Sequence, residues 1–124
     1  MFKKVLIANR GAIAARVLGA LKKLNIQSVV VYSEADVDLP YLKEADEIFC
    51  IGPAEPRLSY LHQDAILNVL KISGADGLHP GYGFLSENAD FARRVNASGA
   101  SFIGPSPEWL EAMGHKTRAR DLMA

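Results

Sequence analysis

Cysteine is nearly absent from this chain of 124 residues, and neither sign of charge is in excess. A secreted domain of this size usually holds several paired cysteines, so the single Cys50 indicates a reducing compartment. The 14 basic and 14 acidic side chains give a formal net charge of zero, which argues against electrostatic binding to nucleic acid or to an anionic membrane. The apolar run that begins at Val5 is too short for a signal peptide core or a membrane span.

Residues that could bind a metal or act as a nucleophile are also sparse. Cys50 has apolar neighbours and no adjacent histidine, so we expect a small buried hydrophobic side chain rather than a nucleophile. His62, His79 and His115 lie far apart without cysteine or carboxylate at ligand spacing, so no metal site is expected. For His79 we expect a partly buried imidazole that holds its loop.

What the chain does have is a regular alternation of apolar runs and helical patterns, with 49% hydrophobic residues overall. Strands are expected at residues 5–8, 27–33, 47–51, 75–78 and 101–103, the first buried on both faces. Helices are expected at residues 12–24, 40–45, around 61–70 with Ser59 as cap, from 89, from 106 with Ser106 as cap, and from 116. This order predicts an α/β fold, a Rossmann-like parallel sheet flanked by helices on both faces.

The most distinctive segment, residues 79–88, connects an expected strand to an expected helix. Parallel sheets bind ligands at the carboxyl ends of their strands. Gly81 and Gly83 flank Tyr82, and the missing Cβ atoms allow the main chain to approach a bound molecule closely. We expect Ser86 to cap the helix that follows. For a Gly-x-Gly pattern alone, a connector without a ligand would be the simpler interpretation.

Two phosphate-binding motifs are only partly present. Gly11 follows the first strand, but the next glycine is Gly19, so the G-x-G-x-x-G motif of dinucleotide-binding domains is absent. Residues 114–117 end like a P-loop, although the preceding glycine spacing is wrong. From spacing alone Lys116 is a solvated lysine, which can still meet a phosphate as a mobile point charge.

Several short segments resemble the opening of the biotin carboxylase family. They are residues 6–11, 45–47, 51–53, 59–61, 79–88, 102–105 and 113–116, with Ile13, Ala14 and Arg16 after the first of them. The similarity runs from Val5 to about Lys116, and residues 79–88 are its most specific part. The family catalyses ATP-dependent carboxylation of biotin on a carrier protein, with bicarbonate as the carbon source.

The resemblance implies that this chain is one domain of a longer enzyme. Residues 1–113 would be the N-terminal (pre-ATP-grasp) domain, and residues 114–124 the start of the connection to an ATP-grasp domain. The full-length enzyme would use ATP, Mg²⁺ and biotin, with its catalytic residues and metal ligands outside this chain, so the isolated chain is expected to be inactive. Its partners would be the ATP-grasp and C-terminal domains, a biotin carboxyl carrier protein or domain, a carboxyltransferase and, in dimeric members, a second copy. We expect it in the cytoplasm, or in the mitochondrial matrix of a eukaryote.

The resemblance also assigns roles to individual residues. It implies that Lys116 contacts the phosphates of ATP. It implies that Gly81, Tyr82 and Gly83 border the cleft in which biotin is carboxylated. It suggests that the helix around Arg16 faces a partner subunit in dimeric members.

The sequence differs from the family pattern at two positions, and two other functions are alternatives to the one implied by the resemblance. Ala12 stands where the family usually has glutamate, and Gly19 lies in mid-helix near Arg16, which puts family-type dimer contacts in doubt. A free-standing Rossmann-like nucleotide-binding or interaction module is the main alternative. A ligase related to carbamoyl phosphate synthase is disfavoured by residues 79–88. The acyl acceptor is not specified, because family members that carboxylate acyl-CoA esters, pyruvate or urea share this domain.

Overall fold

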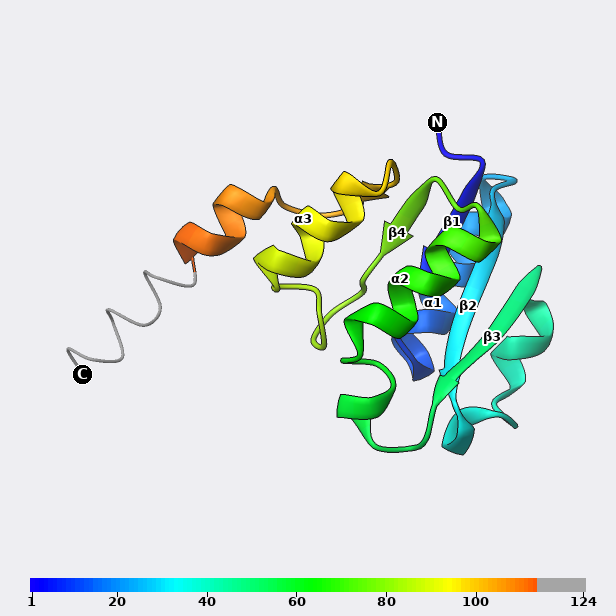
Figure 1. Cartoon of the computed structure of the whole chain (residues 1–124). Helices are drawn as coiled ribbons and strands as arrows, with labels where there is room; N and C mark the ends of the chain where they lie inside the picture. Colours follow the sequence, from blue (N-terminus) through cyan, green and yellow to red (C-terminus); the bar gives the residue numbers. More distant parts are fainter. Residues whose placement is uncertain (114–124) are drawn as a thin grey trace.

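The computed structural model describes residues 1–113, which form a five-stranded parallel sheet with helices on both faces (Figure 1). The strands are β1 (Lys4–Ile7), β2 (Gln27–Ser33), β3 (Glu47–Gly52), β4 (Gly77–His79) and β5 (Ser101–Phe102), in the order β3-β2-β1-β4-β5. All four neighbouring pairs are parallel. The predicted Rossmann-like α/β fold is therefore confirmed.

Helices and short 3-10 segments connect the strands. The α-helices are α1 (Gly11–Lys23), α2 (Gln63–Ser73) and α3 (Ala89–Ala97), and residues 107–113 are also helical. The 3-10 segments are η1 (Glu34–Asp36), η2 (Pro40–Glu44) and η3 (Pro56–Leu58). No helix in residues 1–113 is both long and apolar enough to cross a membrane.

The central strand β1 explains how the layers are held together. Val5 and Ile7 pack with α1, whereas Leu6 packs with α2 and α3 on the opposite face. All three side chains are fully buried, as the unbroken apolar run predicts. Burial of a side chain of this size stabilises the fold by about 1.5–3 kcal/mol. The two faces of the sheet thus form two separate apolar cores.

The start of helices α2 and α3 differs from the sequence prediction. Ser59 does not cap α2, because η3 intervenes and the hydroxyl of Ser59 donates to the carbonyl of Glu55. His62 caps α2 instead, its Nδ1 accepting from the amide of Ala65 at 2.9 Å. Ser86 does not cap α3, since its amide closes a turn onto Gly83 and the helix begins later.

Asn88 takes the place predicted for Ser86. Its side chain accepts from the amide of Phe91 at 2.9 Å. The predicted cap of the next helix is confirmed, because Ser106 Oγ accepts from the amide of Trp109 at 3.2 Å. Caps were therefore predicted correctly only where no extra turn precedes the helix.

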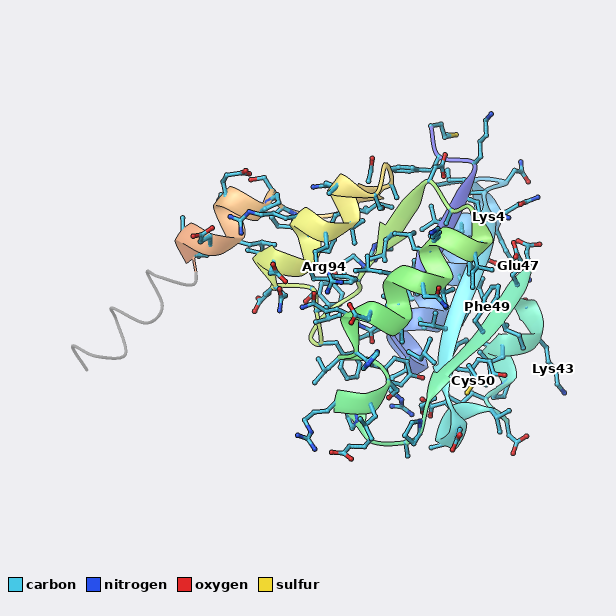
Figure 2. All side chains as sticks on the ribbon, in the orientation of Figure 1. Lys4, Lys43, Glu47, Phe49, Cys50 and Arg94 are labelled. Carbon is cyan, nitrogen blue, oxygen red and sulfur yellow. The ribbon has the colours of Figure 1, made fainter. Side chains whose placement is uncertain are left out.

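Cys50 is exposed, which contradicts the predicted burial. It lies on β3, where side chains alternate between partly buried and exposed (Figure 2). The strand is at the edge of the sheet, so only one of its faces is well covered. An apolar neighbourhood in the sequence did not reveal this alternation.

Candidate functional site

The loops that follow β1 and β4 meet at the carboxyl end of the sheet. The chain proceeds from β1 outward to β2 and β3, and then returns to place β4 on the other side of β1. Such a switch point is where open parallel sheets bind ligands. A crevice of about 460 Å³ lies here. Its lining residues come from both loops and the start of α1, namely residues 9–13 and 82–84.

Asn9 joins the two loops directly. Its Nδ2 donates to the carbonyl of Pro80 at 2.8 Å and to the carbonyl of Tyr82 at 2.7 Å. Its Oδ1 accepts from the amide of Arg10 at 2.8 Å. The residue is 1% exposed, so these hydrogen bonds are shielded from water.

The loop after β4 has an unusual backbone. Gly81, Gly83 and Phe84 all have positive φ, at 67°, 71° and 44°. A Cβ on Gly81 would lie 2.6 Å from Asn9 Nδ2 and 2.8 Å from Ile13 Cγ2, so only glycine fits here. The left-handed backbone of Phe84 costs about 1–2 kcal/mol. Packing offsets this cost, because the ring of Phe84 stacks on Tyr60 with centroids 5.2 Å apart.

A buried carboxylate anchors the same region from the side of β2. Asp36 is 5% exposed and accepts two hydrogen bonds from the guanidinium of Arg10, each 2.7 Å long. The hydroxyl of Tyr60 donates to Asp36 at 2.6 Å. The bond from Arg10 is the main reason that the pKa of Asp36 is lowered. Burial, and then the bond to Asp36, raises the pKa of Tyr60, so its phenol stays protonated.

His79 supports the loop at its entry. Its Nδ1 accepts from the amide of Gly81 at 3.0 Å, and burial lowers the pKa of the imidazole. A neutral imidazole can accept this bond, whereas an imidazolium cannot. The prediction of a partly buried histidine that holds its loop is confirmed.

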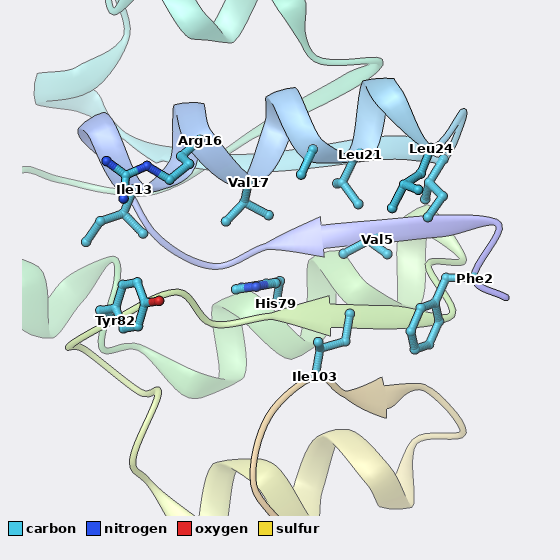
Figure 3. A pocket seen from close by; sticks show the side chains of 12 residues that line it. Phe2, Val5, Ile13, Arg16, Val17, Leu21, Leu24, His79, Tyr82 and Ile103 are labelled. Atoms are coloured by element: carbon cyan, nitrogen blue, oxygen red, sulfur yellow. The ribbon is translucent and has the colours of Figure 1, made fainter.

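A second, apolar hollow lies beside the crevice, between α1 and the strands β1 and β4 (Figure 3). Its volume is about 390 Å³. Arg16 and Val17 of α1 line it from one side, and His79 and Ile103 from the other. We call this hollow the α1 groove.

The structure brings together four of the five predicted site residues. Gly81 and Gly83 lie in the loop at the crevice, and Tyr82 between them is 73% exposed. Tyr82 also reaches the α1 groove, where Arg16 lies on the adjacent helix (Figure 3). Lys116 lies outside the described residues. The crevice and the α1 groove therefore share Tyr82.

Three further residues contribute to the site although they were not among the site residues predicted from the sequence: Asn9, Asp36 and Tyr60. Each follows a strand or a turn that leads to the carboxyl end of the sheet. A polar residue directly after a buried strand was the available signal for Asn9. Asp36 lies in a run of acidic residues that offered no means of distinguishing it from its neighbours.

The described residues can form one side of a binding site, but they do not supply the charged groups of a complete site. Among residues 1–113, Arg10 is the one charged residue that lines the crevice, and it is bound to Asp36. The crevice residues within 1–113 do not by themselves fit a nucleoside triphosphate, whose phosphates need cations that are not already paired. Within residues 1–113, no group of three or more histidine, cysteine, aspartate or glutamate side chains could hold a metal ion.

Comparison with known proteins gives a consistent result. Residues 1–110 match the family model described as biotin carboxylase, N-terminal domain. The chain is 58% identical to the biotin carboxylase of Halalkalibacterium halodurans over 123 residues, which is 99% of this chain and 27% of that protein. It is 47% identical to the mitochondrial propionyl-CoA carboxylase alpha chain of Mus musculus over 119 residues, 96% of this chain and 16% of that one.

A solved structure agrees with these matches. The biotin carboxylase domain of a thermophilic 2-oxoglutarate carboxylase, bound to bicarbonate, superposes with a TM-score of 0.89 at 46% identity. The match covers 99% of this chain and 28% of that chain. The chain thus spans about a quarter of the length of the bacterial relative and of this structure.

Proposed function

The chain belongs to the biotin carboxylase family, and from this we propose that it serves as the N-terminal domain of an ATP- and bicarbonate-dependent ligase that carboxylates carrier-bound biotin. The match over residues 1–110 favours this function over a free-standing nucleotide-binding module. Residues 1–113 form the domain, and residues 114–124 begin the connection to an ATP-grasp domain. The isolated chain is inactive in this proposal.

The hydrogen-bonded loop at the switch point is the structural observation that carries the proposal. Gly81, Tyr82 and Gly83 form one wall of the cleft in which biotin is carboxylated. Asn9 and His79 form hydrogen bonds with the backbone of residues 80–82. A rigid wall suits a reaction with a water-sensitive intermediate, because it keeps water away from the reacting groups.

The remaining parts of the site come from outside the described residues. Lys116 contacts the phosphates of ATP and compensates their negative charge. ATP, with Mg²⁺, supplies the energy for joining the carbon of bicarbonate to biotin. The metal ligands and catalytic residues belong to the ATP-grasp and C-terminal domains.

The partners follow from the same proposal. They are a biotin carboxyl carrier protein or domain and a carboxyltransferase, which selects the acyl acceptor. Arg16, exposed on α1, faces a second subunit in a homodimer. The assembly works in the cytoplasm, or in the mitochondrial matrix of a eukaryote.

A chimera tests the proposed function. The 124 residues replace the matching N-terminal segment of the Halalkalibacterium halodurans enzyme, to which they are 58% identical. Radiolabelled bicarbonate is then followed into free biotin in the presence of ATP, with the unmodified relative assayed in parallel. We expect biotin- and bicarbonate-dependent turnover from the chimera and none from the isolated chain. A folded chimera without turnover, or bicarbonate-dependent ATP hydrolysis by the isolated chain, would contradict the proposal.

A further inference from the structure

We propose that Asn9 is the positioning residue that fixes the backbone of residues 80–82, and with it the biotin-facing wall; the link to biotin rests on the function proposed above. Asn9 lies two residues after the end of β1, far from the loop in sequence. Both of its contacts with the loop are made by the single Nδ2 atom, at 2.8 Å and 2.7 Å. A buried amide group that lost these bonds would carry a desolvation penalty, so the arrangement is strongly preferred.

The loop does not determine this conformation by itself. Gly81 and Gly83 populate positive and negative φ about equally in an unfolded chain, so their sequence leaves the direction of the loop open. The two carbonyls that accept from Asn9, those of Pro80 and Tyr82, lie on either side of Gly81. They converge on one amide group with Gly81 at a φ of 67°. The contact with Asn9 therefore selects one of the backbone conformations open to the glycine.

The same contact orients the exposed part of the wall. The peptide between Tyr82 and Gly83 is trans, since no cis bond occurs in the described residues. In a trans peptide the C=O and N–H groups point in opposite directions. With the Tyr82 carbonyl held toward Asn9, the amide of Gly83 points away from it. Tyr82 as a residue is 73% exposed, so the direction of its side chain is set mainly by this backbone.

Asn9 and Tyr60 hold different parts of the loop. Tyr60 stacks on Phe84 and hydrogen-bonds Asp36, which ties the far end of the loop to the β2 side. The contacts of Asn9 end at Tyr82. Loss of Asn9 should therefore loosen residues 80–83, although Gly81 keeps its bond to His79, while residue 84 stays anchored.

The first test uses the 124-residue chain and the variant Asn9→Asp. The carboxylate has nearly the same shape, but it presents an oxygen to two carbonyl oxygens and repels them. We expect the amide NMR signals of Gly81 and Gly83 to move. We also expect hydrogen exchange of the Gly81 amide, which donates to His79, to accelerate about tenfold or more, the factor that corresponds to about 1.4 kcal/mol. Asn68→Asp, the same change at an exposed position of α2, should leave these signals unmoved.

Asn9→Ser is the second variant, because it removes the amide donors without adding a charge. Unmoved loop signals in both Asn9 variants would overturn the inference. So would unfolding of both, seen as loss of circular dichroism, because Asn9 would then serve the whole fold rather than the loop.

The second test places the variants in the active chimera. We expect Asn9→Asp to raise the KM for biotin about tenfold or more, for the same energetic reason, while the KM for ATP stays unchanged. Lowering the pH should partly restore biotin binding in Asn9→Asp, since a protonated carboxyl can donate one hydrogen bond. Equal changes in both KM values would overturn the link to biotin. If the chimera without a substitution is inactive, the proposed function is wrong. The NMR experiment tests the effect of Asn9 on the loop independently of that outcome.

Discussion

The two faces of the sheet are covered to different degrees. Helices α2 and α3 cover one face, whereas α1 and the short segment η2 cover the other (Figure 1). The difference follows from topology, because right-handed crossovers that run in opposite directions along the sheet lie on opposite faces. Two α-helices connect β3 to β4 and β4 to β5, whereas the chain from β1 to β3 contains one α-helix, α1, and the short segments η1 and η2. Because one α-helix does not cover this whole face, a space remains beside β4, and this space is the α1 groove.

The largest effect should come from the fully covered face. Phe91 is completely buried and contacts Phe102 edge to face, with centroids 6.2 Å apart. Phe91→Ala should reduce the free energy of unfolding by about 3–5 kcal/mol, because it leaves a cavity between α3 and the sheet. Urea denaturation followed by circular dichroism measures this loss. Trp109→Ala, at a side chain that is 53% exposed, is the control and should change stability by at most about 0.5 kcal/mol.

A matched pair of valines compares the faces directly. Val95 on α3 is fully buried, whereas Val17 on α1 borders the α1 groove. Val95→Ala removes two buried carbon groups and should cost about 2 kcal/mol in unfolding free energy. Val17→Ala should cost about half as much, because its side chain already adjoins open space and leaves no new closed cavity. Equal losses in the same denaturation experiment would show that α1 is packed as tightly as α3.

A matched pair of glycines compares the helices themselves. A Cβ added to Gly19 of α1 would meet no atom within 4 Å, and the residue has ordinary helical φ. Gly19→Ala should raise the thermal midpoint and add about 1 kcal/mol of stability. Gly74 ends α2 with a φ of 71°, so Gly74→Ala should destabilise by about 1 kcal/mol despite equal space. If both variants change the stability in the same direction, backbone conformation does not determine the effect of replacing glycine by alanine.

The layout of the fold was predictable because it depends on local patterns. The apolar run at Val5 and the helical spacing after Gly11 are each visible within a few residues, and the alternation of such segments implies a parallel sheet. The loop with Tyr82 could likewise be placed at the carboxyl end of a strand. Local chemistry was enough for all of these.

The contacts that shape the site could not be predicted in the same way. Asn9 bonds carbonyls 71 and 73 positions away, and Asp36 pairs with Arg10 across 26 positions. Such bonds depend on which strands become neighbours, and the sequence pattern does not reveal that order. The exposure of Cys50 was mispredicted for the same reason, since it follows from the edge position of β3.

The smallest effect concerns pH and His79, which lies at the boundary between the α1 groove and the loop. Burial lowers the pKa of His79 in the folded state, so the unfolded chain binds a proton more readily. The resulting stability is fully present above the ordinary histidine pKa of about 6.5 and is lost as the pH falls through the lower folded pKa. Asp36 also has a lowered pKa, but its loss of stability begins only near the ordinary aspartate pKa of about 3.9.

His79→Asn keeps an acceptor near Nδ1 but removes the titration. We expect the unfolding free energy of the native chain to fall between pH 7.5 and pH 5.5, and that of His79→Asn to fall less. Urea titrations at both pH values give the comparison, and the variant serves as its own reference at pH 7.5. Because His79 is only partly buried beside the α1 groove, the difference should be smaller than the losses at Phe91 or Val95. If the unfolding free energies of the two proteins change equally with pH, the prediction is wrong. Water would then reach the imidazole through the α1 groove, and burial would not lower the pKa of His79.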